Sequence, residues 1–105
     1  MAGTLIKFMN AGATAWTKGS LGQEARLGIN LDDVTWASLG VSWPLPNRVA
    51  TQTEALVNAG QTATFTFQVK APAAPGVYSI HLRPVIDGVT WMEDEGVFLI
   101  VTVIP

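Results

Sequence analysis

Two runs in which apolar and polar residues strictly alternate constrain the fold of this chain more than any other feature. Every second position is apolar in residues 62–70, and the same holds between Tyr78 and Leu82 in residues 77–86. Successive side chains of a β-strand point to opposite faces, so this period predicts strands with one buried and one solvated face. Together with a strand expected at residues 5–9, the residues predicted for the core are Ile6, Phe8, Phe65, Phe67, Val69, Tyr78, Ile80 and Leu82.

A stiff connector, "APAAPG" at residues 71–76, joins the two alternating runs. A tight hairpin between such strands needs a two-residue turn such as Asn-Gly or Asp-Gly. Here Pro72 and Pro75 each fix their own φ angle and hold the preceding residue in an extended conformation. The connector therefore predicts an arch that carries the chain from one sheet to a facing sheet, as in a β-sandwich.

Turn signals separate short segments along the whole chain, and no segment shows a helical period. Asp87-Gly88 is the strongest hairpin signal, whereas residues 35–43 are ambiguous between strand and irregular structure. The fold class expected is all-β, an antiparallel immunoglobulin-like β-sandwich of about seven to nine short strands. Residues 1–105 are expected to form a single domain, excised from a longer protein. The expected strands cover residues 5–9, 13–17, 24–29, 48–57, 61–70, 77–86 and 97–104.

Composition narrows the classes of function. Of the 105 residues, 49% are hydrophobic and 13% are charged, and six scattered lysines and arginines stand within a net charge of −2. The chain therefore lacks the basic patch that nucleic-acid binding requires. No apolar run reaches the roughly 18 residues of a membrane-spanning helix, so we expect no membrane span. The absence of cysteine excludes disulfides and thiol catalysis and leaves the compartment open.

No set of catalytic or metal-binding residues is evident in the sequence. His81 is the only histidine, and the alternation places it on the outward face of its strand beside Arg83. The serines lack a nucleophile-elbow motif, and the glycines form no phosphate-binding loop. Asp32-Asp33 and Glu93-Asp94-Glu95 would offer oxygen ligands to calcium only if their loops met, and solvated loop charges are the simpler interpretation. We therefore expect no enzyme, no cofactor and no metal.

Four tryptophans are a large number for a chain of this length. A tryptophan ring buries about 150–250 Å², so Trp16, Trp36 and Trp91 are expected to pack in the core. Trp43 differs because two prolines follow it in "WPLP". We expect this stiff loop to project the Trp43 ring into solvent as a small contact site, since a rigid anchor loses little entropy on binding.

Several segments occur in an order that resembles a known domain family. They are "NAGATAWT", "RLG", "TW", "LPNRV", "GQTATFTFQVKAPAAPGVY" and "LRPVIDGVTW", and the match extends from about Leu5 to Val103. The chain is similar to the four-tryptophan (FW) domain, the immunoglobulin-like module of the next-to-breast-cancer-gene-one family. The most specific part of the resemblance is "F-x-V-x-A-P-x-x-P-G-x-Y". The family includes autophagy cargo receptors and many bacterial, often secreted, multidomain proteins.

The sequence also departs from the family pattern. Trp16 and Trp36 match namesake tryptophans, whereas Ile6 and Leu82 stand where members commonly carry tryptophan. The core is therefore expected to be refilled by another ring, either Trp91 or Trp36. Members usually have a further edge strand before the first strand seen here, so we expect that segment to be absent or trimmed. The low charge and the many alanines, threonines and glycines favour a bacterial member.

The resemblance implies a non-catalytic protein–protein interaction module within a larger multidomain protein, because the domain recruits protein partners in the cargo receptors. The alternative is an accessory carbohydrate-binding module of an exported bacterial protein, and a purely structural spacer is a third possibility. Two tryptophan rings exposed on one face would favour sugar, whereas buried rings and an apolar sheet face would favour protein. An extracytoplasmic location in a bacterium is the expected compartment.

The last strand suggests where a partner would bind. In "VFLIVTVI" both faces are apolar, although a strand with one solvated face normally alternates. If the odd-numbered residues fill the core, then Phe98, Ile100 and Ile104 face outward, as Leu5 and Met9 do around Lys7 in the first strand. We expect one apolar patch that meets a protein partner or a second copy of the chain, unless a loop such as residues 30–47 covers it. The predicted partner-binding residues are Trp43, Leu5, Met9, Phe98 and Ile100.

Overall fold

The computed structural model describes residues 2–92 and 96–104 as an all-β domain with principal extents of 47 × 21 × 21 Å. Every pair of neighbouring strands is antiparallel. The strands are β1 (Ala2–Met9), β2 (Trp16–Thr17), β3 (Arg26–Ile29), β4 (Gly40–Val41), β5 (Arg48–Thr51), β6 (Leu56–Val57), β7 (Thr62–Val69), β8 (Gly76–Ile86), β9 (Thr90–Trp91) and β10 (Val97–Val103), with short 3₁₀ turns at Asn30–Asp32 and Ala37–Leu39. The ambiguous residues 35–43 are thus mostly irregular.

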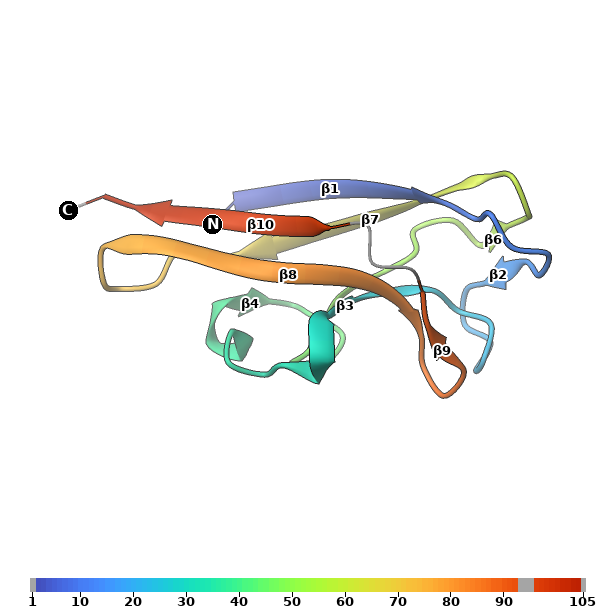
Figure 1. The fold of residues 1–105 in the computed structure, drawn as a ribbon, viewed down its shortest axis with the longest axis horizontal. Helices are drawn as coiled ribbons and strands as arrows, with labels where there is room; N and C mark the ends of the chain where they lie inside the picture. The colour runs from blue at the N-terminus through green and yellow to red at the C-terminus, as the bar shows by residue number, and fades with distance from the viewer. Residues whose placement is uncertain (1, 93–95, 105) are drawn as a thin grey trace.

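Two sheets face each other and confirm the predicted antiparallel β-sandwich. One sheet has three strands in the order β1-β7-β4, and the other has five, in the order β10-β8-β3-β5 with β9 paired to β8. A separate pair, β2-β6, lies at one end of the molecule (Figure 1). Figure 1 also shows β1 and β10, the first and last strands of the chain, along the same long side of the domain.

The proline-rich connector forms the predicted arch between the sheets. It leaves β7, the central strand of the three-stranded sheet, and enters β8 in the five-stranded sheet. The Tyr78 hydroxyl donates a hydrogen bond to the backbone carbonyl of Ala74 (2.7 Å) and so ties the arch to the start of β8. The Trp36 ring packs edge-on against the Tyr78 ring, with ring centroids 6.0 Å apart. These contacts hold the end of the sandwich closed at this connector.

The alternating residues of β7 and β8 supply the centre of the core, as predicted. Five of the predicted core residues are buried: Phe65, Phe67, Val69, Ile80 and Leu82. The other three are half-buried: Ile6, Phe8 and Tyr78. The Phe8 and Phe65 rings meet edge to face at 6.0 Å, which is a favoured aromatic geometry. Trp16 is buried as expected, whereas Trp36 packs against the core from its margin.

The predicted hairpin after β8 is present but has one more residue than the Asp-Gly signal implied. Ile86 pairs with Thr90, so the turn consists of Asp87, Gly88 and Val89. Gly88 has a φ of 78°, and the Val89 N–H donates to the Ile86 carbonyl (3.0 Å). A glycine at positive φ closes a three-residue turn as readily as a two-residue turn. The Asp-Gly dipeptide therefore predicted the position of the turn correctly but not its length.

Buried polar side chains connect the loops at the end of the sandwich. Asn10 donates to the carbonyls of Thr14 (2.9 Å) and Val57 (3.1 Å), and its Oδ1 accepts the Gly12 N–H (3.1 Å). Gln52 accepts the N–H of Ala25 and donates to the carbonyls of Trp16 and Glu54. Because nearly all their polar atoms are paired, these amides fix the loops around Trp16 without leaving unsatisfied groups in the core.

Replacing Leu82 by alanine tests the assignment of the core. We expect Leu82→Ala to lower the free energy of unfolding by about 2–5 kcal/mol, because Leu82 is fully buried and the change leaves a cavity. Val77→Ala, on the exposed face of the same strand, is the matched control and should change stability by less than about 0.5 kcal/mol. Denaturant unfolding of the three proteins measures both values, and equal losses would contradict the burial described here.

A second prediction concerns acid stability. Glu54 Oε1 accepts the N–H of Thr64 (2.9 Å) and the hydroxyl of Thr53 (3.2 Å). Burial raises the pKa of Glu54, but these hydrogen bonds outweigh it and hold the pKa below the usual 4.5. A carboxyl with a lowered folded-state pKa stabilises the fold above its unfolded pKa, and this stabilisation is lost as pH falls through the folded pKa. We therefore expect Glu54→Gln to flatten the decline in the free energy of unfolding below pH 4.5. Identical pH profiles for the variant and the wild type would contradict this role.

Candidate functional site

The exposed apolar surface of the five-stranded sheet is the strongest candidate for a functional site. On β10 the outward residues Phe98 and Ile100 are 52% and 55% exposed, and Val77 of β8 is also exposed beside them. Pairing of Thr102 with Val77 and of Ile100 with Ser79 places these residues on one face. We call Val77, Phe98, Ile100 and Ile104 the outer patch. The exposed residues of β10 confirm that the outward face of the last strand is apolar, like its inward face.

His81 forms the inner border of the outer patch. It lies opposite Phe98 in the strand pairing, and the two rings stack with centroids 4.4 Å apart at an interplanar angle of 25°. The stacking orders the Phe98 side chain beside His81 on the outer face of the sheet. A pre-positioned aromatic ring offers contact area at little cost in side-chain entropy.

The single apolar patch expected from the two terminal strands is in fact two surfaces. Leu5 and Met9 are exposed on β1, where Leu5 pairs with the exposed Thr66 of β7. They therefore lie on the outer face of the three-stranded sheet, and the outer patch lies on the outer face of the facing sheet. The outer faces of a sandwich point in opposite directions, so Leu5 and Met9 do not extend the outer patch.

The loop expected as a possible cover for this surface lies elsewhere. Within residues 30–47, β4 pairs with β7 in the three-stranded sheet, and Trp36 packs on Tyr78 near the arch. The interpretation that this segment folds over Phe98 and Ile100 is therefore wrong, since both side chains remain more than half exposed.

The prediction that Trp43 projects freely into solvent is also wrong. Its ring lies directly on Gly40, where a Cβ atom would come within 2.7 Å of the indole. The indole Nε1 donates a hydrogen bond to the Gln68 carbonyl on β7 (2.9 Å). The neighbouring residues Pro44 and Leu45 are exposed instead. The prolines stiffen the loop, but the gap above Gly40 and the free carbonyl on the neighbouring strand determine where the ring lies.

Trp91 is held between two arginines on the outer face of the five-stranded sheet. The guanidinium carbons of Arg48 and Arg83 lie 4.9 and 5.8 Å from the ring centroid, within the range of cation–π attraction. The ring also covers Gly28, where a Cβ atom would approach it to 3.0 Å. Trp91 therefore does not refill the core as expected. It extends the outer face of the sheet beyond His81, on the far side from the outer patch.

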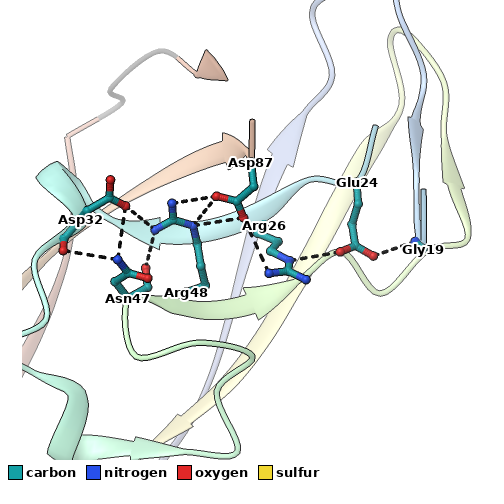
Figure 2. Close-up of polar contacts among 7 residues, drawn as sticks. All are labelled: Gly19, Glu24, Arg26, Asp32, Asn47, Arg48 and Asp87. Atoms are coloured by element: carbon teal, nitrogen blue, oxygen red, sulfur yellow. Dashed lines mark hydrogen bonds and ion pairs between the residues drawn. The ribbon is translucent and has the colours of Figure 1, made fainter. Parts of the chain in front are cut away.

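A network of ion pairs fixes this part of the face, and sequence reasoning missed it. Arg48 is buried and contacts Asp87 and Asp32, each at 2.8 Å, and Arg26 contacts Asp87 at 3.7 Å (Figure 2). Burial lowers the pKa of Arg48, but the hydrogen bonds and charges of Asp87 and Asp32 outweigh it and raise the pKa above its usual value. The arginine therefore stays charged, and its ion pairs with two aspartates suit a structural role. The signal in the sequence was a single arginine in an otherwise apolar strand, "RVA".

The acidic residues considered for calcium are engaged in other contacts. Asp32 pairs with Arg48, and Asp33 accepts the N–H (2.8 Å) and the hydroxyl (2.5 Å) of Thr35. The hydrogen bonds from Thr35 lower the pKa of Asp33. Glu93-Asp94-Glu95 lies outside the described residues. In residues 2–92 and 96–104, no group of three metal-ligating side chains is present.

An apolar cavity of about 440 Å³ lies at the end of the sandwich that carries the β8–β9 hairpin. Its lining includes Phe8, Met9, Trp16, Ile86 and Met92. Of the predicted partner-binding residues, Met9 thus lines this cavity, whereas Phe98 belongs to an open face. The cavity has the size of small-ligand sites, but the described residues of its walls include no charged side chain that would orient a polar ligand.

Comparison of the chain with models of protein families, with curated proteins and with solved structures gives no match. The similarity to the FW domain therefore stays a prediction from the quoted motifs. No helix of a length and hydrophobicity that would span a membrane occurs in the part of the chain that the structure describes.

Removal of the Arg48 charge tests the role of the network. We expect Arg48→Met to cost about 1–3 kcal/mol of unfolding free energy, because Asp87 loses its main partner and Trp91 loses a covering cation. Arg26→Met is the control and should cost less than about 1 kcal/mol, since its ion pairs are partly exposed. Thermal and denaturant unfolding give the values. A larger loss for Arg26→Met would show that the network is centred elsewhere.

Proposed function

We propose that this chain is a non-catalytic protein–protein interaction module of a larger protein, and that its contact surface is the outer face of the five-stranded sheet. The observation that carries this proposal is the outer patch, in which Phe98, Ile100 and Val77 are exposed side by side on regular strands. Exposed apolar area costs roughly 25 cal/mol per Å², and monomeric proteins seldom leave such groups clustered without a use.

The composition of the face supports a protein partner. Beyond His81, the surface continues into Arg83 and Trp91, which together with phenylalanine belong to residue types enriched at protein interfaces. The Arg83 Nε donates to the Met92 carbonyl (2.5 Å), and Trp91 lies between two cations, so both side chains are already ordered. An ordered contact surface loses less entropy when a partner binds. The face thus combines an apolar half and a pre-organised polar half.

The arrangement of the tryptophans does not favour the carbohydrate-binding alternative. Trp16 is buried, and the other three rings are half-buried against Tyr78, Gly40 or Gly28. A sugar-binding platform needs a ring face open to solvent, whereas Trp36, Trp43 and Trp91 each pack on a neighbouring residue and none of them is fully exposed. Sugar binding is therefore kept only as one outcome of the experiment below.

The strand neighbours support the proposed membership of the immunoglobulin-like FW family. The order β10-β8-β3-β5 corresponds to the G-F-C-C′ sheet of immunoglobulin-type sandwiches, and β1-β7 corresponds to strands B and E of the other sheet. The correspondence departs at β4, which pairs with β7 before the chain returns to β5 in the opposite sheet. We propose that the chain is a bacterial, extracytoplasmic member of this family.

Selection from a displayed library of random peptides, alongside an array of glycans, tests the proposed function. We expect the immobilised domain to enrich peptides and to retain no glycan. The enriched peptides should lose about tenfold or more in affinity for the double variant Phe98→Asp and Ile100→Asp, because charge replaces the apolar centre of the face.

A variant with Leu21→Asp and Leu31→Asp is the matched control, since both leucines are exposed but lie outside the sheets. Peptide binding should be unchanged in this control. Retention of glycans without peptides would overturn the proposed function in favour of the carbohydrate-binding alternative. Peptide binding that is insensitive to the Phe98 and Ile100 changes would remove the outer patch as the contact surface.

A further inference from the structure

The four strands at the ends of the two strand orders, β1-β7-β4 and β10-β8-β3-β5, differ in how well they resist pairing with another chain. The edge strands β4 and β5 have only 2 and 4 residues, and short edges are poor templates for pairing. The third edge strand, β1, carries Lys7 near its centre, and an exposed lysine is a common device against edge-to-edge association. The fourth, β10, has 7 residues (Val97–Val103) with no charge and no proline. It is the unprotected edge among the described strands.

The edge of β10 exposes side chains as well as backbone groups. Its inward residues are only half-buried, whereas the inward residues Ile80 and Leu82 at the centre of the neighbouring strand β8 are fully buried. A groove of about 430 Å³ separates β10 from β1, and its walls include Thr4, Val69, Leu99 and Val101. A further strand placed beside β10 would cover these half-buried residues and would pair the free backbone groups of β10.

We propose that this strand is β10 of a second copy of the chain, paired antiparallel across a two-fold axis at Ile100, so that the two five-stranded sheets become one continuous sheet. The inference rests on the proposed interaction function and names its partner and geometry. A two-fold axis at Ile100 is the register in which all 7 residues of β10 (Val97–Val103) are paired. The paired positions would be Ile100 with itself, Leu99 with Val101, Phe98 with Thr102, and Val97 with Val103.

This register is self-complementary in polarity and in side-chain direction. Residues opposite each other have the same parity, so outward residues meet outward residues and inward residues meet inward residues, as a continuous sheet requires. No like charges oppose each other, because β10 carries none. The outward row would place two Ile100 side chains between two Phe98 rings, joining the outer patches of the two copies.

One strand pair is a small interface compared with the roughly 1,200–2,000 Å² of stable complexes. The association is therefore weak and depends on concentration, with a dissociation constant of about micromolar to millimolar. A weak isologous contact of this kind allows the domain to act when several copies are brought together by a larger assembly.

Disulfide trapping tests the register, and the absence of cysteine from the chain makes it unambiguous. In the proposed dimer the two Ile100→Cys residues face each other with Cβ atoms about 4.5–5.5 Å apart, close enough for a disulfide after small movements. Two Phe98→Cys residues would be four positions apart along the strand, or about 13 Å, and too distant to bond. Under oxidised glutathione, Ile100→Cys should form covalent dimer about tenfold faster or more than Phe98→Cys, which is the matched control.

Sedimentation and hydrogen exchange test the association without a cross-link. Wild-type protein should show a monomer–dimer equilibrium, and Ile100→Lys should raise its dissociation constant about tenfold or more because two lysines would meet on the axis. Val77→Lys adds the same charge to the same face one strand from the edge, and should leave the equilibrium unchanged. Alternate amides of β10, those that point away from β8, should gain protection from exchange as the concentration rises.

Three outcomes would overturn the proposed dimer. The first is that the wild-type protein sediments as a monomer at every concentration, and the second is that both cysteine variants form covalent dimer at the same rate. The third is that the protein forms assemblies larger than dimers in which the amides of β10 gain no protection from exchange. If Val77→Lys weakened association as much as Ile100→Lys, the copies would meet face to face and the edge pairing would be wrong. If no dimer forms but the domain still binds peptides, the proposed function stands. If neither the dimer nor peptide binding is found, both proposals are wrong.

Discussion

Burial of the inward residues of β7 and β8 is the interaction on which the rest of the structure depends. The two strands are central in their respective sheets, and Phe65, Phe67, Ile80 and Leu82 close the space between them. The proline-rich arch makes this pairing of faces local in sequence, because the chain crosses from one sheet to the other in a few residues. Strands β1, β3, β5 and β10 extend the two sheets outward from these central strands.

Polar ties position the loops around this apolar core. Asn10 and Gln52 pair buried backbone groups at the end that holds Trp16, and Arg48 joins β5 to the hairpin residue Asp87 on the outer face. Each of these side chains is buried, so its hydrogen bonds offset a desolvation cost that would otherwise destabilise the fold. Arg48 of this network also lies against the Trp91 ring, which is how a structural tie contributes to the proposed contact face.

The proposed contact face and the core arise from the same strands. In β8 and β10, inward residues complete the sandwich, and outward residues Val77, Phe98 and Ile100 leave an apolar row in solvent. The same geometry leaves β10 open at its edge, next to the groove shared with β1. Face and edge are continuous, so the proposed contact face and the proposed dimer contact belong to one surface.

The alternation of residue type determined the all-β class and the inward residues of β7 and β8, and the two prolines of the connector determined the arch. Each of these features depends on a few consecutive residues, so it can be predicted from the local sequence. Only the tertiary structure decided that Leu5 and Met9 lie on the opposite outer face, that Trp43 lies back on Gly40, and that Arg48 meets an aspartate 39 positions away. Those outcomes depend on which strands become neighbours, and on the space and the unpaired carbonyl groups between them. Contacts between residues distant in sequence leave no repeating pattern in the local sequence, so they cannot be predicted from it.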